Sequence, residues 1–245
     1  MNGKQLNAIK KELDAQADPV RASHSLRFFK TGPGQYGEGD VFIGITMPAL
    51  RKVCKNYRDL SIADLRELLA SKVHEHRMAA VVIMADVFKK SSPTRQDDIY
   101  NLYMQGLRKN QINNWDIIDV SCPHIIGEYL LDKPADPLYD LAKSDHLWSK
   151  RVAIISTFMF LKYGNATDTI RISEILLHDA HDLIQKAVGW ALREVGKTAG
   201  EETLTVFLDK HAGCMPRTML RYSIEKLSTK QRQHYLAIKG DKIRT

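Results

Sequence analysis

The sequence predicts an all-α protein built as a helical-repeat solenoid. Apolar residues recur with helical spacing behind recognisable helix-start signals, and no segment alternates apolar and polar residues as a half-buried strand would. Similar segments also recur at intervals of 35 to 37 residues. One helix pair of this length cannot bury its apolar face alone, so neighbouring pairs stack. We therefore expect a single domain over residues 1–245, wound as a right-handed α-α superhelix with a concave basic groove.

Helix starts are marked along the first half of the chain. Residues 4–16 have an amphipathic pattern, and Asp18 with Pro19 supplies an N-cap and a first-turn proline for a second helix that reaches about Lys30. The next starts are Thr46 with Pro48, which leads toward Tyr57, then Ser61 with Asp64, and Ser92 with Pro93, which opens a long helix to Leu107.

A glycine-rich stretch, residues 31–40, separates the second predicted helix from the third. It contains four glycines, but no strand precedes it and no Gly-Lys-Ser/Thr follows. It therefore matches neither phosphate-loop fingerprint. We expect a flexible surface loop, and a backbone contact to a ligand phosphate is the less favoured alternative.

The repeat is defined by a polar or basic residue placed before a small, apolar helical run. Arg77, Arg151 and Lys186 each hold this place, and Asn114 lies midway between the first two. The intervals are 74 residues, which is twice 37, and then 35 residues. A weaker copy covers residues 217–224. Repeats of this length predict a HEAT-like architecture.

Residues 113–123 place two carboxylates and an indole in an otherwise apolar helical segment, which Pro123 is expected to end. Trp115 and Asp119 are four residues apart and share one helix face. Asp119 could be the partner of a basic residue, an N-cap for another helix, or a catalytic anion. On this segment alone the structural roles are favoured.

A second segment combines basic and aromatic residues on one helix face. These residues follow helical spacing at Lys186, Trp190, Arg193 and Lys197, and Trp148 with Arg151 repeats the pattern over one turn. A charged stripe alone is typical of a solvated face, and an aromatic residue alone is typical of a core. Both together favour a groove for nucleic acid, in which basic groups hold phosphates and indoles cover sugar or base.

Three segments resemble the AlkD family of bacterial DNA alkylation-repair glycosylases. They are NWDIID at residues 114–119, LWSKR at 147–151 and IQKAVGWALRE at 184–194. The likeness covers nearly the whole chain. It implies a HEAT-like solenoid that hydrolytically releases N3- and N7-alkylated purines, such as 3-methyladenine and 7-methylguanine, from double-stranded DNA.

The resemblance also implies roles for single residues. Asp119 corresponds to the family's catalytic aspartate, Trp115 and Trp190 to its active-site tryptophans, and Arg151 and Arg193 to its DNA-contacting arginines. Phe28 stands where the family usually has tyrosine, so a hydroxyl is missing. The neighbouring Phe29 or Tyr36 could take that role instead. With Trp148, Lys186 and Lys197 from the helical stripe, these residues form the predicted site.

One carboxylate is enough for this chemistry. Alkylation at N3 or N7 gives the purine a positive charge, so the base leaves without a general acid. Positive charge then develops on the sugar, where a nearby anion stabilises it and orients the attacking water. The arrangement is that of a glycoside hydrolase without its proton donor.

The composition fits a packed globular chain with a polyanionic partner. The 245 residues are 44% hydrophobic, and 36 lysines and arginines against 29 acidic residues give a net charge of +7. The three cysteines have no paired spacing, which predicts free thiols in a reducing compartment. The beginning of the chain has no signal-peptide pattern and no apolar run is long enough to cross a membrane. We expect a cytoplasmic monomer, located at the nucleoid when it is bound to DNA.

No cofactor, metal or covalent intermediate is predicted. His178 and His181 are three residues apart, but they lie in a polar segment typical of the cap before a helix. His74 and His76 are too close in sequence to share a helix face. No serine or cysteine has a base at a diagnostic spacing.

Two other functions remain open. The chain could be a non-catalytic HEAT-like DNA-binding protein, although the combination of Asp119 with Trp115 and Trp190 favours an enzyme. It could also be a protein-interaction scaffold, for which an acidic or apolar stripe would be more typical than a basic one.

Overall fold

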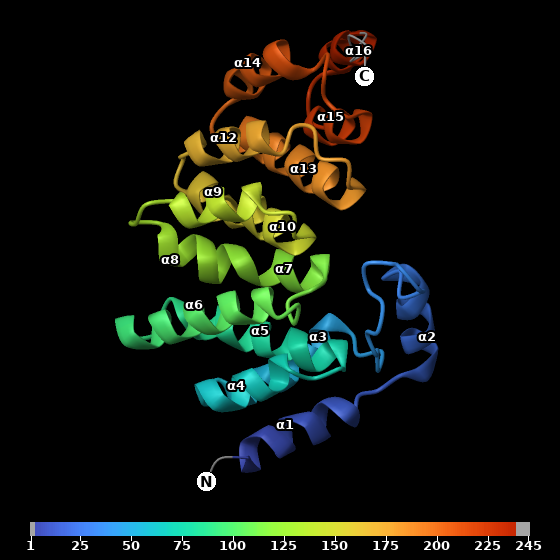
Figure 1. The fold of residues 1–245 in the computed structure, drawn as a ribbon, viewed down its shortest axis with the longest axis vertical. Helices are drawn as coiled ribbons and strands as arrows, with labels where there is room; N and C mark the ends of the chain where they lie inside the picture. Colours follow the sequence, from blue (N-terminus) through green and yellow to red (C-terminus); the bar gives the residue numbers. More distant parts are fainter. Residues whose placement is uncertain (1–2, 239–245) are drawn as a thin grey trace. The chain divides into compact units, whose positions relative to one another are not determined.

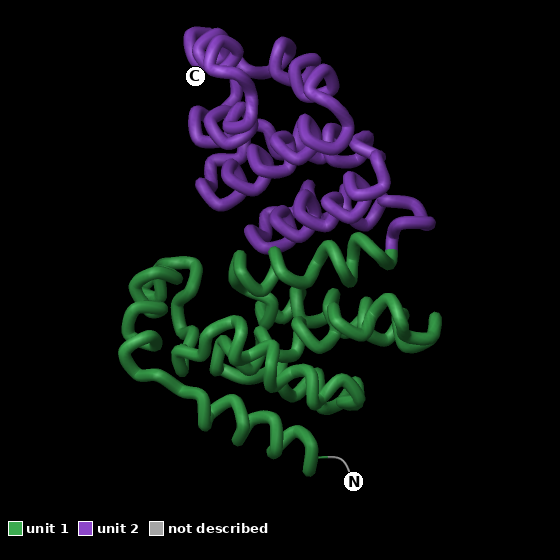
Figure 2. Tube along the Cα trace, turned by 180° about the vertical axis from the view of Figure 1, so that it is seen from behind, with its two compact units in different colours: residues 1–129 green, residues 130–245 purple. Residues whose placement is uncertain are grey.

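The computed structural model describes residues 3–238, which form helices joined by short connections. The chain divides into two compact units, residues 1–129 and 130–245 (Figure 2). Within the described residues the sole β-type pairing is an isolated bridge between Val41 and Val73. The all-helical, helical-repeat prediction is confirmed. The single domain, the right-handed superhelix and its concave groove stay predictions.

The first unit is built from short and medium helices (Figure 1). They are α1 (Lys4–Asp14), α2 (Pro19–Phe28), α3 (Met47–Cys54) with a 3₁₀ turn (Lys55–Tyr57), α4 (Ile62–Leu69), α5 (His74–Phe88), α6 (Pro93–Arg108), α7 (Trp115–Cys122) with a π turn (Pro123–Gly127), and α8 (Glu128–Leu130), which reaches the second unit.

The predicted helix starts in this unit are confirmed by their caps. The side chain of Asp18 accepts hydrogen bonds from the backbone N–H groups of Val20 and Arg21, and Pro19 follows it as predicted. Thr46, Ser61 and Ser92 cap α3, α4 and α6 in the same way. Side-chain oxygens thus satisfy backbone donors that the first helical turn leaves unpaired.

Helix α5 is the centre of the first unit. Most of its residues are buried on all sides, including the run from Met78 to Met84. A helix that is apolar around its whole circumference lies inside a structure rather than at its surface. Helices α3, α4, α6 and α7 pack against it. The polar residues at its first turn, beginning at His74, are therefore buried as well.

Helix α2 lies to one side of this stack (Figure 1) and has no buried residue. Its first turn packs against the backbone of Ile43 and Gly44. Gly44 has a positive φ of 83°, and a Cβ atom there would lie 2.2 Å from the carbonyl oxygen of Asp18. The carboxylate of Glu75 accepts hydrogen bonds from the N–H groups of Ile43 and Gly44. Glycine is needed here because the two backbones approach closely.

The glycine-rich stretch is a hydrogen-bonded loop that ends in the interior. The N–H of Gly32 donates to the side chain of Gln35, and the N–H of Gly34 donates to the side chain of Glu38. The N–H of Gly37 donates to the carbonyl of Lys30. Asp40, the last residue of the stretch, is buried. The prediction of a simple surface loop is therefore wrong at this end.

The predicted end of the helix at Pro123 is also wrong. Pro123 has helical backbone angles, and the chain continues through the π turn from Pro123 to Gly127. The wider turn shifts the hydrogen-bonding register at the residue that lacks an N–H group, so the helical path continues.

The second unit is centred on its longest helix, α13. Its helices are α9 (Asp136–Lys143), α10 (Leu147–Ser156), α11 (Phe158–Lys162), α12 (Thr167–Ile175), α13 (Asp182–Thr198), α14 (Glu201–His211), α15 (Arg217–Ser223) and α16 (Thr229–Ala237). Helices α10, α12, α14 and α15 pack against α13. Within residues 3–238, every helix is too short or too polar to span a bilayer.

Helices α13 and α15 meet at Gly189. A Cβ atom at this position would lie 2.5 Å from the carbonyl oxygen of Met219 and 2.5 Å from the Cβ atom of Tyr222. Only glycine permits the two helices to approach this closely. Gly189 therefore fixes the spacing of the helix that carries Trp190.

Candidate functional site

Trp115 and Asp119 both lie on α7, one helical turn apart, as predicted. Asn114 caps this helix, because its side-chain oxygen accepts the N–H of Trp115 at 2.8 Å. Ile117, Ile118 and Cys122 anchor the helix in the core, whereas Trp115 and Asp119 are half-buried. The apolar positions thus hold α7 in place and leave the indole and the carboxylate at its partly exposed face.

Asp119 lies close enough to the buried phenol of Tyr103 to influence its ionisation. Burial raises the pKa of Tyr103 well above its ordinary value, and the negative charge of Asp119 adds to the rise. The Tyr103 hydroxyl lies 3.0 Å from the Ser121 hydroxyl, which in turn donates to the carbonyl of Ile117. A neutral hydrogen-bonded pair therefore lies behind the site, on the core side of α7.

An aromatic cluster surrounds Trp115. The ring of Phe29 stacks on the indole with a centroid separation of 5.4 Å, and Phe28 meets the indole edge-on at 5.9 Å. Phe42 also stacks on Phe29, with a centroid separation of 5.0 Å. Phe28 is 65% exposed although it is a large apolar residue. The structure thus brings the predicted residues Phe28 and Trp115 together, and both Phe28 and Phe29 contact the indole.

Behind this cluster lies a buried polar network that sequence reasoning missed. His74 lies between two carboxylates, with Nε2 at 2.9 Å from Oδ2 of Asp116 and Nδ1 at 3.5 Å from Oδ2 of Asp40. Arg77 forms an ion pair with the other oxygen of Asp40 at 2.7 Å. The amide of Asn113 donates to the same Asp40 oxygen and its carbonyl accepts from Arg77.

The network controls the charge of His74. Burial alone would lower its pKa, but the hydrogen bond to Asp116 and the interaction with Asp40 outweigh burial and raise the pKa from 6.5 to about 9. The pKa of Asp40 is lowered despite burial, because His74, Arg77 and Asn113 favour its ionised form. At neutral pH this histidine is therefore a buried cation between two anions.

In the second unit, α13 carries the predicted basic and aromatic stripe. Lys186, Trp190 and Arg193 are half-exposed and Lys197 is exposed. The structure adds a carboxylate beside each cation. Lys186 pairs with Asp182 at 2.8 Å, Lys197 with Glu194 at 3.4 Å, and Arg193 with Glu225. The stripe is thus a set of ion pairs, and a phosphate would have to displace a carboxylate at each cation.

Trp190 is not a core residue. Its ring meets Phe158 edge-on at 4.7 Å, and its Nε1–H donates to Glu194 at 3.3 Å. The part of a half-buried indole that its neighbours leave uncovered can contact a ligand, while the N–H at its edge keeps its polar partner. This arrangement is compatible with a contact to DNA and differs from simple core packing.

Trp148 and Arg151 do not form an exposed stripe. They are 3% and 5% exposed, and the guanidinium of Arg151 donates to the carbonyl of Leu183 at 2.7 Å. The predicted stripe on α10 is therefore not exposed, because this helix is buried on nearly every side, with Val152 and Ile154 also buried. Direct contact of either residue with DNA would require α10 to become exposed.

His181, at the start of α13, has a structural role. Nδ1 of His181 accepts the N–H of Leu183 at 3.1 Å, which makes it the N-cap that the sequence predicted. Across residues 3–238, no group of three His, Cys, Asp or Glu side chains is placed to hold a metal ion. Cys54 and Cys122 are buried thiols and Cys214 is an exposed thiol, and none of these three forms a disulfide.

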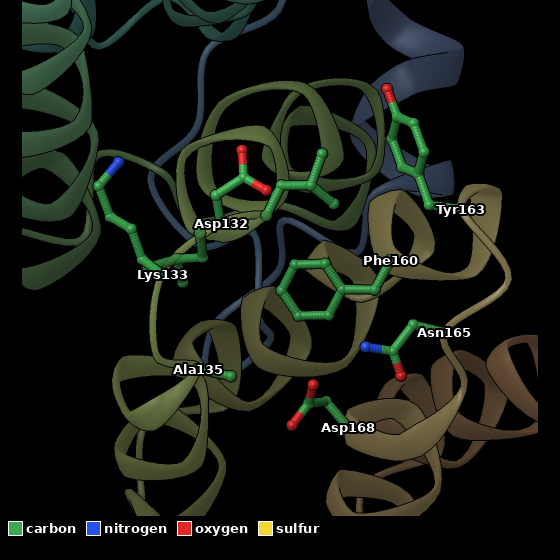
Figure 3. Close-up of a pocket in the computed structure, with 9 residues that line it drawn as sticks. Asp132, Lys133, Ala135, Phe160, Tyr163, Asn165 and Asp168 are labelled. Atoms are coloured by element: carbon green, nitrogen blue, oxygen red, sulfur yellow. The ribbon is translucent and has the colours of Figure 1, made fainter.

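A separate depression of about 440 Å³ lies within the second unit (Figure 3). The ring of Phe160 projects into it, with Asp132, Asn165 and Asp168 around it. Asp168 already accepts a hydrogen bond from the Tyr139 hydroxyl at 2.6 Å. None of the predicted site residues lines this depression, so it is distinct from the candidate site.

One signal in the sequence pointed to the missed network. Residues 74–77 place four charged or titratable side chains directly before the most apolar run of the chain. Such residues at the start of a buried helix must find partners, because an unpaired buried charge is costly. Asp40 and Asp116, the partners of His74 and Arg77, are far away in sequence and could not be identified from it.

Comparisons with known proteins agree with this architecture. The chain resembles a solved structure described as a predicted DNA alkylation repair enzyme from Enterococcus faecalis, with a TM-score of 0.67 and 17% sequence identity over 87% of this chain and 98% of that one. At that identity the likeness shows the fold alone. No curated protein matches the chain. The family model for DNA alkylation repair enzymes matches residues 9–227, and the chain therefore belongs to the DNA alkylation repair enzyme family.

Proposed function

We propose that this protein is a monofunctional DNA glycosylase that hydrolyses the N-glycosidic bond of N3- and N7-alkylated purines in double-stranded DNA. The observation that carries the proposal is the pair formed by Asp119 and Trp115 on α7. The carboxylate and the indole are half-buried, share one helix face and are held by a capped helix with a buried apolar side. Membership of the DNA alkylation repair family supports it.

Asp119 supplies the negative charge that the reaction needs. The alkylated purine is cationic and leaves as a neutral base, so the sugar becomes positively charged as the bond lengthens. A fixed carboxylate beside the sugar stabilises this charge in the transition state more than in the ground state. The same group orients the water that attacks the sugar carbon. No proton donor is required at the leaving base.

The aromatic cluster around Trp115 provides a surface for the damaged nucleotide. The face of an indole attracts a cation through its quadrupole, and the alkylated base and the developing sugar are both cationic. Phe28 and Phe29 restrict the orientation of Trp115. The exposed ring of Phe28 extends the apolar surface outward. Because Phe28 stands where the family usually has tyrosine, this apolar surface is proposed to contact the substrate without a hydroxyl group.

The cations of α13 are proposed to bind DNA phosphates. Lys186, Arg193 and Lys197 are accessible, and each is now paired with a carboxylate. Exposed pairs of this kind contribute little to stability, so exchanging a carboxylate for a phosphate costs little. Trp190, between them on the same helix, is proposed to contact the damaged nucleotide.

The test is to replace Asp119 with asparagine, which keeps the shape of the side chain and removes its charge. Wild type and Asp119→Asn are incubated with duplex DNA that contains 7-methylguanine or 3-methyladenine, and free base and alkali-labile sites are measured. We expect the variant to retain folding and DNA affinity and to release base about 10²- to 10³-fold more slowly.

The matched control is Asp98→Asn, because Asp98 is an exposed carboxylate on α6 and its loss changes the net charge equally. It should release base at the wild-type rate. If wild type binds alkylated duplex but releases no base, the protein is a non-catalytic DNA-binding member of the family. If Asp119→Asn is as fast as wild type, Asp119 is structural and the assignment is wrong.

A further inference from the structure

His74 contacts the candidate site through two routes. Its Nε2 atom lies 2.9 Å from Oδ2 of Asp116, the residue that directly follows Trp115 in α7. The other oxygen of Asp116 accepts the N–H of Ile117 at 2.8 Å. The carboxylate of Asp116 thus links the imidazole of His74 to a backbone N–H group that the first turn of α7 leaves without a helical partner.

The second route runs through aromatic rings. The imidazole of His74 stacks on Phe42 with a centroid separation of 4.4 Å and lies 5.3 Å from the ring of Phe29. Phe29 in turn stacks on the indole of Trp115 at 5.4 Å. The imidazole therefore supports both the backbone that begins α7 and the ring that rests on Trp115.

Three ionisable neighbours determine the charge on His74. The ionisable groups that face it are Asp116 from α7, Asp40 from the loop before α3, and Arg77 from its own helix. The two carboxylates favour the protonated ring, and Arg77, which is itself paired with Asp40, opposes it. At neutral pH both ring nitrogens carry protons, and each faces a carboxylate oxygen.

We propose that His74 is a positioning residue for the glycosylase site. Its imidazolium fixes the first turn of α7, and thereby the direction in which Trp115 and Asp119 point. This inference rests on the proposed function for its catalytic consequence, whereas the coupling of His74 to Trp115 does not depend on it. Catalytic groups held within a narrow range of positions lower the barrier, and a displacement of about 1 Å costs about 10²-fold in rate.

The chain offers a matched control in His76, two residues later in α5. His76 is also buried, and both of its ring nitrogens are hydrogen-bonded, to Asp14 at 3.0 Å and to the Ser71 hydroxyl at 3.1 Å. The ring contacts that join Phe29, Phe42, His74 and Trp115 do not include His76. Replacing His76 therefore removes a buried, doubly bonded histidine from the same helix without touching Trp115.

The first experiment follows Trp115 directly. The full chain is labelled with 5-fluorotryptophan, and its three fluorine resonances are assigned with single Trp→Phe variants. In the wild type, the Trp115 resonance should titrate with a midpoint of about pH 9, the pKa of His74. His74→Gln should abolish this titration, and His76→Gln should leave it unchanged. A Trp115 resonance that does not move with pH in the wild type, or that still titrates in His74→Gln, overturns the coupling.

The second experiment measures base release under single-turnover conditions at pH 7. His74→Gln should lower the rate about 10- to 100-fold with an unchanged Kd for DNA, while His76→Gln should match the wild type. Combining His74→Gln with Asp116→Asn should cost no more than the larger single effect, because both remove the same link. Additive losses, or an active His74→Gln, overturn the positioning role.

The two experiments separate the two proposals. If wild type releases no base, the proposed function fails, and the fluorine titration still decides whether His74 sets the environment of Trp115. If His74→Gln does not fold, the pH titration of the Trp115 resonance in the wild type and in Asp116→Asn tests the coupling instead. In Asp116→Asn the pKa of His74 should fall, and the Trp115 midpoint should move below pH 9 with it.

Discussion

Gly189→Ala is expected to destabilise the second unit by forcing α13 and α15 apart. The added Cβ atom would lie 2.5 Å from both the Met219 carbonyl oxygen and the Tyr222 Cβ atom, whereas ordinary van der Waals contact begins at 3.4 Å. The helices must therefore separate by 3.4 − 2.5 = 0.9 Å. Neither of the opposing atoms can rotate away, because one is backbone and the other is attached to it.

The magnitude follows from two opposing contributions. Overpacking of this kind costs about 1–3 kcal/mol, and the upper end applies because the contact is with backbone. The higher helix propensity of alanine relative to glycine stabilises the folded state by about 1 kcal/mol. The net loss for Gly189→Ala is therefore about 2 kcal/mol, or roughly 4–8 °C in Tm for a chain of this size.

Gly196→Ala in the same helix is the control. Its Cβ atom would lie 2.8 Å from Cδ2 of Leu204, the far end of a flexible side chain that can move. The helix-propensity gain is the same, so the difference between the two variants reports the packing at Gly189. Circular dichroism on heating and in urea provides the measurement. The reasoning fails if Gly189→Ala is as stable as Gly196→Ala.

Three further predictions concern charge and the indole. The pKa of His74 is raised from 6.5 to about 9 on folding, so its contribution to stability is full below pH 6.5 and is lost progressively as pH rises to about 9. The loss is on the order of 3 kcal/mol, and urea titrations at pH 6 and 9.5 should show it in wild type and not in His74→Phe. Trp190→Ala should slow base release strongly, and it should lower stability by less than the roughly 3–5 kcal/mol typical of a core tryptophan. Base-release kinetics and thermal melts of the same variant measure the two effects. A large loss of stability with unchanged kinetics would contradict the prediction. Lys197→Ala should make the slope of log Kd for duplex DNA against log salt shallower by about 1, whereas an unchanged slope would exclude Lys197 from phosphate binding.

Local sequence signals were sufficient to predict the helices. The caps at Asp18, Thr46 and Ser92 act within three residues of themselves, so their effect can be read directly from neighbouring residues. Trp115 and Asp119 could be placed on one face for the same reason, since helix geometry fixes residues four apart. Pro123 was misread because the rule that proline ends a helix does not anticipate a π turn.

The features that sequence reasoning missed depend on packing between distant segments. The network around His74 joins residues 40, 74, 77, 113 and 116, and no local pattern connects the first of these to the last. Trp148 and Arg151 were misplaced for a related reason. Their helix is buried on nearly every side although it contains polar residues, so spacing alone cannot tell which face meets solvent. Of the carboxylates beside the α13 cations, Glu225 lies on a distant segment, whereas Asp182 and Glu194 stand four and three residues from Lys186 and Lys197, so helical spacing could have predicted those two.

The way in which α2 is attached has a consequence for its dynamics. Since the helix buries no residue, its hold on the unit depends on the hydrogen bond from Asp18 to Ile43, the close approach at Gly44 and the aromatic contacts of Phe28 and Phe29. Such a segment opens at a free energy well below that of global unfolding. Amide hydrogens of α2 should therefore exchange with solvent by local opening, while those of α5 exchange only when the whole unit unfolds. The ring of Phe28 is thus carried on the part of the unit that can adjust to a ligand, and its contact with Trp115 transmits that adjustment to α7.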